Sequence, residues 1–159
     1  MREYKIEAIV HVCEMAELSE EDRELVEAAK QATDGSYAPY SKFLVGAAVR
    51  LQNGTIVTGA NQENAAYPSG LCAERTALFA AGAQHPTQPV VALAIAARKG
   101  KRFLAQPIPP CGACRQVISG MEERYAVPIR ILLYGTEGVL VSDGISPLLP
   151  LRFADEDMR

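Results

Sequence analysis

Cys72-Ala73-Glu74-Arg75 and, downstream, Pro110-Cys111-Gly112-Ala113-Cys114 are the two segments around which this chain is organised, and they hold three of its four cysteines. Cys111 and Cys114 are three positions apart, so in the first turn of a helix both sulfurs can reach one ion. Cys72 could supply a third ligand. Three ligands and an open fourth position are typical of a catalytic zinc, which makes a bound water acidic enough to attack at neutral pH. Glu74 would then carry the proton.

The same cysteines also have plainer interpretations. A closed zinc site that only stabilises the fold needs a fourth ligand such as Cys13, His11 or His85, and none of these stands at a recognisable ligand spacing. A redox pair in the second segment would suit a thioredoxin-like chain, but it leaves the first segment unexplained. Glu74 taken alone could be a solvated or capping charge at a helix N-terminus.

Length and composition favour one compact domain. The chain has 159 residues, of which 48% are hydrophobic and 22% are charged, and we expect a single domain over residues 1–159. Residues 1–18 match no motif, and their role stays open. The formal net charge of −3 and the isoelectric point near 5.4 argue against a groove that follows polynucleotide phosphates. We therefore expect a small or uncharged substrate and no nucleic acid partner.

Neither a targeting segment nor a membrane segment is expected. Met1–Lys30 is rich in Glu and has no apolar stretch long enough for a signal peptide, which predicts a cytoplasmic protein. Val90–Ala97 is the longest apolar run, and it is far shorter than the ~20 residues that cross a bilayer. Four cysteines could form two disulfides, but a reducing compartment and the tight spacing of Cys111 and Cys114 favour metal or redox chemistry.

Hydrophobic periodicity predicts an alternation of helices and strands. Ser19 and Asp22 resemble a capping box at the start of a helix, and Asn53-Gly54 between two β-rich runs predicts a hairpin. The expected helices cover Ser19 to Ala32, Cys72 to Ala83 and Gly112 to Tyr125, and the expected strands cover Leu44 to Leu51, Thr55 to Ala60, Pro89 to Ala97, Ile129 to Tyr134 and Val139 to Val141. This order predicts an α/β fold in which helices enclose a mixed sheet.

The segments between these elements are less regular. Ile6–Val12 could be a first strand or a helical turn, and residues 61–70 have the composition of a binding loop. Tyr37–Phe43 predicts an extended loop whose rings either stack on a base or cover the core. Arg98–Gln106 is expected to be a charged loop, with its basic cluster solvated.

Six stretches that keep their order and spacing from about Leu25 onward resemble the cytidine deaminase family, of the small homotetrameric type. They are Ala38-Pro39-Tyr40-Ser41-Lys42-Phe43, Val45-Gly46-Ala47-Ala48, Asn61-x-Glu63-Asn64, Cys72-Ala73-Glu74-Arg75-Thr76-Ala77, Pro110-Cys111-Gly112-Ala113-Cys114-Arg115-Gln116 and Leu148-Leu149-Pro150 with Phe153. The resemblance implies a three-layer α/β/α sandwich with a five-stranded mixed sheet. It also implies one Zn²⁺ per subunit and the hydrolysis of cytidine and deoxycytidine to uridine and deoxyuridine, with release of ammonia, in pyrimidine salvage.

The resemblance also implies roles at the metal. Cys72, Cys111 and Cys114 are similar to the family's zinc ligands, and Glu74 is similar to its proton shuttle. Three cysteines with a Glu that is not a ligand are a pattern already described for zinc deaminases. Arg75 matches a residue that hydrogen-bonds the thiolates. Since three thiolates on a divalent ion leave a net charge of −1, a nearby guanidinium offsets part of the excess.

Further roles concern the substrate and a neighbouring subunit. Phe43, Asn61 and Glu63 are similar to the family's nucleoside contacts, with Asn61 and Glu63 reaching the ribose 3′-hydroxyl. Tyr67 and Phe153 would approach the site of another subunit in the homotetramer. No organic cofactor is implied.

Two alternatives to a free-nucleoside deaminase stay open. One is a deaminase of another substrate, such as blasticidin or the cytosine of a polynucleotide, because such enzymes share the two zinc motifs. The other is a noncatalytic interaction module that zinc stabilises. Phe43, Asn61 and Glu63 favour the nucleoside over the first alternative, and Glu74 favours an enzyme over the second.

Overall fold

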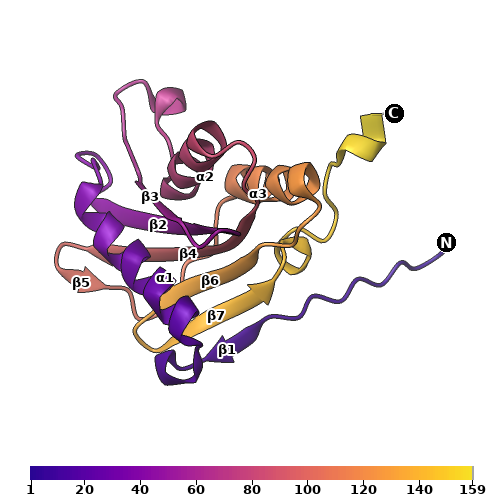
Figure 1. The fold of residues 1–159 in the computed structure, drawn as a ribbon, viewed down its shortest axis with the longest axis horizontal. Helices are drawn as coiled ribbons and strands as arrows, with labels where there is room; N and C mark the ends of the chain where they lie inside the picture. Colours follow the sequence, from indigo (N-terminus) through magenta and orange to yellow (C-terminus); the bar gives the residue numbers. More distant parts are fainter. Residues whose placement is uncertain (159) are drawn as a thin grey trace.

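A seven-stranded mixed sheet with helices on both faces forms the centre of the structure, a computed structural model that describes residues 1–158 (Figure 1). The strand order is β1-β7-β6-β4-β2-β3, and β5 pairs with β4. The strands are β1 (His11–Cys13), β2 (Phe43–Leu51), β3 (Ile56–Ala60), β4 (Val90–Lys99), β5 (Arg102–Phe103), β6 (Arg130–Gly135) and β7 (Gly138–Asp143), and the helices are α1 (Glu20–Ala32), α2 (Ala73–Gln84) and α3 (Gly112–Tyr125).

The predicted α/β fold with a mixed sheet between helices is confirmed, but the predicted count of five strands is wrong. All five expected strands are present, as β2, β3, β4, β6 and β7, and two short strands are added. β1 pairs antiparallel with β7, and β5 folds back on β4 inside the segment expected to be a charged loop. Strands of three and two residues are too short to give a hydrophobic period, so β5 has no sequence signal of its own, and β1 has only the apolar run Ile6–Val12 that leaves a strand or a helical turn open.

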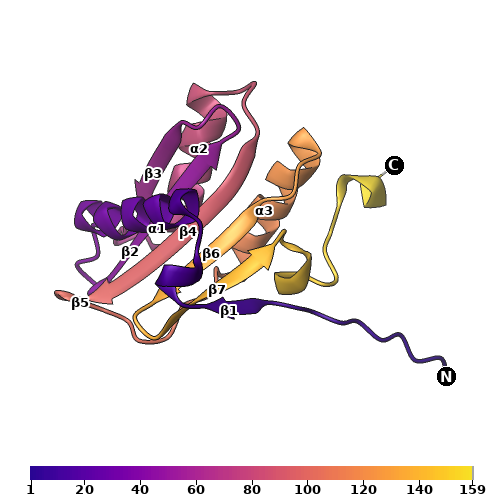
Figure 2. The same ribbon diagram turned by 60° about the horizontal axis from the view of Figure 1, so that its bottom comes forward.

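β4 is covered on both faces, as its continuous apolar sequence predicts. On one face Ala92, Ala94 and Ala96 belong to a buried cluster with α1. On the other face Leu93 and Ile95 belong to a second cluster, which contains buried residues of α2 and α3. The alternation of a strand therefore produces the three layers, with α1 on one side of the sheet and α2 and α3 on the other (Figure 2).

Local signals in the sequence explain where the first elements begin and turn. Ser19 is the N-cap of α1, and its Oγ accepts a hydrogen bond from the Asp22 N–H at 3.1 Å. The β2–β3 hairpin turns at Asn53-Gly54, where Gly54 adopts φ of 87°. Asn53 Oδ1 accepts the Thr55 N–H at 3.0 Å, which closes the turn.

The connections of β4 place the N-termini of two helices at one end of the sheet. β4 and β6 are parallel, so α3 must leave the carboxyl end of β4 and return to its start. α2 precedes β4 and ends near the start of that strand. The N-termini of α2 and α3 therefore lie together at the carboxyl end of β4 (Figure 1).

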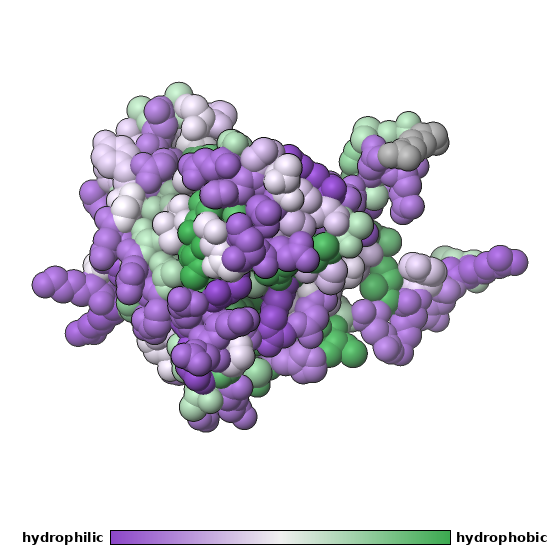
Figure 3. All heavy atoms as spheres, in the orientation of Figure 1, coloured by the Kyte–Doolittle hydropathy of each residue, from purple (hydrophilic) through white to green (hydrophobic). Residues whose placement is uncertain are grey.

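Both ends of the chain project from the body (Figure 3). Residues 1–10 are exposed and lie outside the regular elements, so the open choice between a strand and a helical turn for Ile6–Val12 resolves to a strand only from His11. Across residues 1–158, helices long and apolar enough to span a membrane are absent.

Candidate active site

Three sulfurs meet where α2 and α3 begin. Cys72 is the N-cap of α2, Cys111 is the N-cap of α3, and Cys114 lies in the first turn of α3. The Sγ atoms of Cys72 and Cys111 are 3.9 Å apart, and those of Cys111 and Cys114 are 3.5 Å apart. All three lie within 4.8 Å of one another, although Cys72 and Cys111 come from opposite sides of β4 in the sequence.

The sulfur cluster has the dimensions of a zinc site. Zinc–sulfur bonds of about 2.3 Å in a tetrahedron put the sulfurs roughly 3.8 Å apart, close to the spacing that Cys72, Cys111 and Cys114 have. Cys114 is buried, Cys72 is half-buried and Cys111 is exposed, so the cluster is open on one side. Three thiol ligands with one accessible side fit a zinc ion that keeps a position for water.

Electrostatics around the cluster favour a thiolate. The pKa of Cys72 is lowered to about 5 by a hydrogen bond with Cys114 and by another from Arg75, and burial opposes this shift. The same Cys72–Cys114 contact raises the pKa of Cys114, followed by the effect of burial. The N-terminus of α2 adds partial positive charge at Cys72. These contacts therefore favour the thiolate form of Cys72.

Arg75 lies against this charge. Its Nη2 donates to Cys72 Sγ at 3.5 Å, and this hydrogen bond raises the pKa of the guanidinium. Among the described residues, Arg75 Nε is the buried side-chain nitrogen or oxygen that lacks a hydrogen-bond partner. A guanidinium held in this way offsets negative charge on the sulfurs, as the net charge of three thiolates on a divalent ion requires.

Glu74 is a buried carboxyl beside the sulfurs. Only 5% of the residue is exposed. Burial raises the pKa of Glu74, the charge on Cys72 adds to this, and hydrogen bonds with its own N–H and with Cys114 oppose it. A solvated capping charge would show neither the burial nor the raised pKa. The geometry therefore favours a carboxyl that takes up and returns protons in the site.

The candidate ribose contacts form a second group that is tied to the start of β2. Asn61 Nδ2 donates to the Phe43 carbonyl at 2.9 Å, and its Oδ1 accepts the Val45 N–H at 2.9 Å. Phe43 is half-buried and packs against the cluster between the sheet, α2 and α3. The amide of Asn61 therefore fixes the strand that begins with Phe43 and keeps one N–H and one lone pair free of these bonds.

Glu63 is held by the loop in front of β2. Its Oε2 accepts the Tyr40 N–H at 2.9 Å and the Ser41 N–H at 3.2 Å. Hydrogen bonding, first with the Ser41 side chain, lowers the pKa of Glu63, so the group is a carboxylate at neutral pH. Between the two candidate contacts, Gln62 exchanges backbone hydrogen bonds of 2.9 Å with Leu71, the residue before Cys72. The second group is thereby placed beside the sulfur cluster.

Tyr67 and Phe153 lie on the surface. Tyr67, in the short 3₁₀ helix η3 (Tyr67–Ser69), is 72% exposed, and its ring is 6.0 Å from that of Tyr40. Phe153, in the C-terminal tail, is 59% exposed, and its carbonyl accepts a hydrogen bond from Gln116 Nε2 at 2.8 Å. Neither ring is buried within its own chain.

Four hydrogen bonds that support the site, two from Arg115 and two from the backbone of Tyr37, could not be predicted from the sequence. Arg115 Nε donates to the Pro110 carbonyl at 2.8 Å, and its Nη1 donates to the Leu148 carbonyl at 2.6 Å, so this residue joins the approach to Cys111 to the tail. The backbone of Tyr37 exchanges hydrogen bonds with Asn61 and Glu63, at 2.9 and 2.8 Å. Because every acceptor here is a backbone carbonyl, composition and spacing could not reveal these contacts.

The region with this geometry matches a known family. Residues 19–127 match the family model of the cytidine and deoxycytidylate deaminase zinc-binding region. The chain belongs to this family. All three clustered cysteines and Glu74 fall inside the matched residues, and the cluster fits one zinc per chain of this deaminase family.

Relatives of known activity and solved structure agree with this membership. The chain is 44% identical to a cytidine deaminase of Halalkalibacterium halodurans over 134 residues, which are 84% of this chain and 95% of that one. It is similar to the crystal structure of cytidine deaminase from Burkholderia pseudomallei, with a TM-score of 0.69 and 42% identity over 82% of this chain and 97% of that one. A blasticidin-S deaminase of Bacillus cereus is 31% identical over 86% of this chain and 94% of that protein.

Proposed function

We propose that this chain is a zinc-dependent cytidine deaminase, which hydrolyses cytidine and deoxycytidine to uridine and deoxyuridine and releases ammonia. The observation that carries the proposal is the buried Glu74 carboxyl beside three clustered thiols, in a chain whose family is defined by this region. A noncatalytic zinc module has no use for a buried carboxyl with a raised pKa at its metal.

The chemistry requires a strong nucleophile and a ring that accepts it. Cys72, Cys111 and Cys114 would hold the zinc, which when bound would lower the pKa of a water from 15.7 toward about 7. In this proposal Glu74 is the group that accepts a proton from the attacking water and donates it to ring N3, which makes C4 a better electrophile. The same carboxyl then helps to protonate the amino group that leaves. One group serves all three transfers because its raised pKa lies closer to neutrality than that of a solvated Glu.

The ribose is held by the second group of residues. In this proposal the free N–H and lone pair of Asn61 and the ionised carboxylate of Glu63 bond the 3′-hydroxyl, and the ring of Phe43 lies against the nucleoside. Their rigid attachment to β2 and to the loop before it supports this role. A site that pairs a substrate hydroxyl rejects a compound without it by factors of up to roughly 10⁴ to 10⁵. Free cytosine should therefore be a very poor substrate.

The proposal includes a homotetramer with composite active sites. Cys111 is exposed in the single chain, whereas a nucleoside undergoing hydrolysis has to be shielded from bulk water. Tyr67, five residues before Cys72, and Phe153, in the C-terminal tail, are exposed rings, and in this proposal they supply the apolar cover of a neighbouring subunit's site. We place the enzyme in the cytoplasm and in pyrimidine salvage, because clustered free thiols are retained in a reducing compartment.

A direct assay tests the function. The purified protein is incubated separately with cytidine, deoxycytidine, free cytosine, blasticidin S and single-stranded DNA, and conversion of the base is followed by its ultraviolet absorption. We expect rapid loss of the amino group from the two nucleosides and little from the others. Preferential turnover of blasticidin S or DNA would replace the nucleoside in the proposal, and zinc binding without turnover of any substrate would refute an enzyme.

A further inference from the structure

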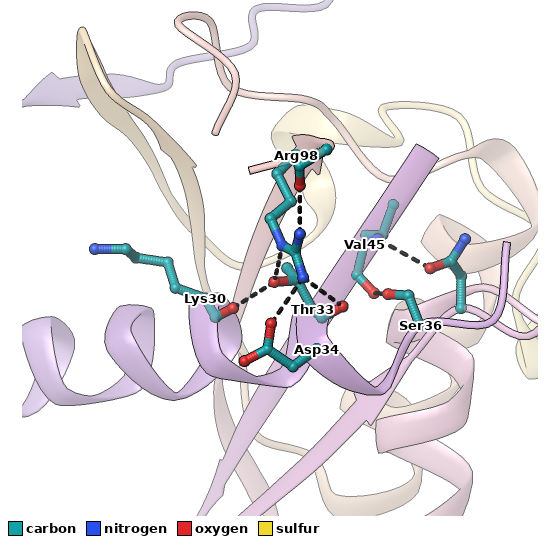
Figure 4. Close-up of polar contacts among 8 residues, drawn as sticks. Lys30, Thr33, Asp34, Ser36, Val45 and Arg98 are labelled. Atoms are coloured by element: carbon teal, nitrogen blue, oxygen red, sulfur yellow. Dashed lines mark hydrogen bonds and ion pairs between the residues drawn. The ribbon is translucent and has the colours of Figure 1, made fainter. Parts of the chain in front are cut away.

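The guanidinium of Arg98, near the end of β4, holds the chain that follows α1 (Figure 4). Its Nε donates to Thr33 Oγ1 at 2.7 Å, and its Nη2 forms an ion pair with Asp34 Oδ1 at 2.7 Å. A longer bond of 3.4 Å joins Nη2 to the Thr33 carbonyl, and Nη1 donates to the Gly100 carbonyl. Only 16% of the Arg98 side chain is exposed. The expectation of a solvated basic loop is therefore wrong for Arg98.

These contacts leave Arg98 little capacity for a ligand from outside the chain. A guanidinium has five N–H donors, and the four bonds of Arg98 within the chain engage all three of its nitrogens. A cavity of about 350 Å³ lies beside it, but there Lys30 is already paired with Glu27 at 2.6 Å. Arg98 thus acts on the fold of its own chain and not as an anion site.

The segment that Arg98 holds leads directly to the candidate ribose contacts. Thr33 and Asp34 belong to a short 3₁₀ helix, η2 (Thr33–Gly35). The next residue, Ser36, donates from Oγ to the Val45 carbonyl at 3.0 Å (Figure 4). After it, the Tyr37 N–H donates to the Asn61 carbonyl at 2.9 Å and the Glu63 N–H donates to the Tyr37 carbonyl at 2.8 Å. Only Gly35 and Ser36 therefore separate the residues held by the guanidinium from Tyr37, whose backbone bonds Asn61 and Glu63.

A second route runs through the sheet. In the β2–β4 pairing, Arg98 stands opposite Leu44, between the Phe43 and Val45 positions. Those two residues are the ones whose carbonyl and N–H bond the Asn61 side chain. The backbone of Arg98 therefore pairs with the strand that Asn61 contacts, and its guanidinium holds the segment that lies against the backbone of Asn61.

We propose that Arg98 is a positioning residue for ribose recognition, which sets the place of Asn61 and Glu63 by clamping Thr33 and Asp34 onto the end of β4. The proposal rests on the proposed function, because it gives Asn61 and Glu63 their role at the 3′-hydroxyl. Arg98 itself touches neither the nucleoside nor the metal ligands.

The chain offers a matched control at the other end of α1. Arg130 Nε donates to Asp22 Oδ2 at 3.0 Å, and its Nη1 bonds Asp143 Oδ1 at 2.5 Å. Arg130 thus clamps the first turn of α1 to β6 and β7, just as Arg98 clamps the segment after its last turn. Within residues 1–158, Arg130 makes its side-chain hydrogen bonds and ion pairs with Asp22 and Asp143 and none with the loops that carry Asn61 and Glu63. Its loss therefore removes a comparable clamp that does not lead to those loops.

The experiment compares Arg98→Met with Arg130→Met on two substrates, cytidine and 3′-deoxycytidine. Zinc content and melting temperature are measured on the same samples. We expect both variants to keep their zinc and to melt at lower temperature than the wild type. In R98M the ratio of kcat/KM for cytidine to that for 3′-deoxycytidine should fall by roughly 10-fold or more, since small displacements of positioned groups cost up to about 10²-fold. In R130M this ratio should stay within about twofold.

The ratio separates positioning from a general loss of stability, because an unstable protein loses activity on both substrates equally and the ratio stays the same. Arg98→Lys keeps one charged donor and should restore part of the ratio, and it carries the test should R98M fail to fold. If the ratio in R98M equals that of the wild type, the inference is overturned and the proposed function is not affected. If only R98K folds, an unchanged ratio in R98K has the same meaning. An equal fall in R130M also overturns the inference. Absence of cytidine turnover in the wild-type protein overturns the proposed function and this inference with it.

Discussion

Two residues at the start of α2, Cys72 and Glu74, have pKa values that are shifted in opposite directions. Cys72 has a lowered pKa because Cys114 and Arg75 hydrogen-bond it, whereas burial raises the pKa of Glu74 two residues later. The side chains differ in what they face, since Glu74 is inside and Cys72 is half-exposed at the cap. One helical turn therefore provides both a stable anion for a metal and a carboxyl that can hold a proton.

Glu74→Gln tests the proton shuttle. Glutamine keeps the shape of the side chain but cannot accept a proton, so cytidine turnover should fall by ~10⁴ or more, at or beyond the usual contribution of a general acid/base. Zinc content and melting temperature should stay near the wild-type values, because Glu74 is not one of the clustered thiols. Metal, melting temperature and turnover are measured together. Loss of zinc would make Glu74 a ligand, and near-normal turnover would remove it from the mechanism.

Cys114→Ala tests the ligand set, with Cys13→Ala as its control. Cys114 is one of three thiols in the cluster, so its loss should strongly reduce bound zinc, measured by metal analysis after dialysis. Cys13 is half-buried and packs against the α1 side of the sheet, far from that chemistry, so C13A should keep about one zinc per chain. Equal zinc retention in the two variants would contradict the assignment.

The candidate site divides into a part that the sequence predicts and a part that it does not. The spacing of Cys111 and Cys114, with Cys72 and Glu74 upstream, follows from what a metal ion requires of its ligands, so the amino-acid sequence alone predicts it. The buried clamp of Arg98 is not predicted in this way, because Asp34 and Thr33 lie 64 and 65 residues away and two of its four acceptors are backbone carbonyls. A lone basic residue in a charged run looks the same whether it is solvated or folded inward.

At the scale of secondary-structure elements, the sequence predicts the helices and strands that have a clear hydrophobic pattern. The strand β4 and the helix α3 are recovered because long apolar runs and helical patterns have clear limits, and the predicted bounds of α3 are those observed. β5 is missed, and for β1 the sequence leaves a strand or a helical turn open over Ile6–Val12, since two or three residues next to a partner strand gain their structure from that partner. Whether such short segments become strands depends on tertiary pairing, which local preference does not encode.

Replacing two glycines by alanine should change the stability of the protein in opposite directions. A Cβ on Gly46, in β2, would lie 2.2 Å from the Ala29 carbonyl oxygen of α1, so Gly46→Ala forces helix and sheet apart and should cost about 1–3 kcal/mol or more. Gly120 lies in α3 with open space around it, so Gly120→Ala should stabilise the protein by about 0.5–1 kcal/mol. Thermal melts check both. A stable G46A variant would show that α1 does not pack as closely as the structure has it.

At the scale of the whole molecule, the proposed tetramer predicts that an exposed tail ring matters for activity. Phe153→Ala should lower cytidine turnover by roughly 10-fold, because a desolvated site loses part of its cover. Leu151→Ala is the control, since Leu151 is 75% exposed in the same tail. Sedimentation should give about four times the 17.1 kDa of one chain for the wild type. A stable, fully active monomer would contradict the composite site.

The zinc-site cysteines come before and after β4 in the sequence, and this order has a consequence for folding. Cys72 precedes that strand and Cys111 follows it, and the two meet only when α2 and α3 both pack at its carboxyl end. The β4–β6 pairing that α3 spans is parallel and non-local, the kind of contact that forms slowly. We therefore expect zinc capture to be a late event, which follows assembly of the sheet. In refolding experiments, metal uptake reported by a coloured chelator should follow the far-ultraviolet signal of the sheet, and helix and strand content should rise at the same rate with zinc or without it.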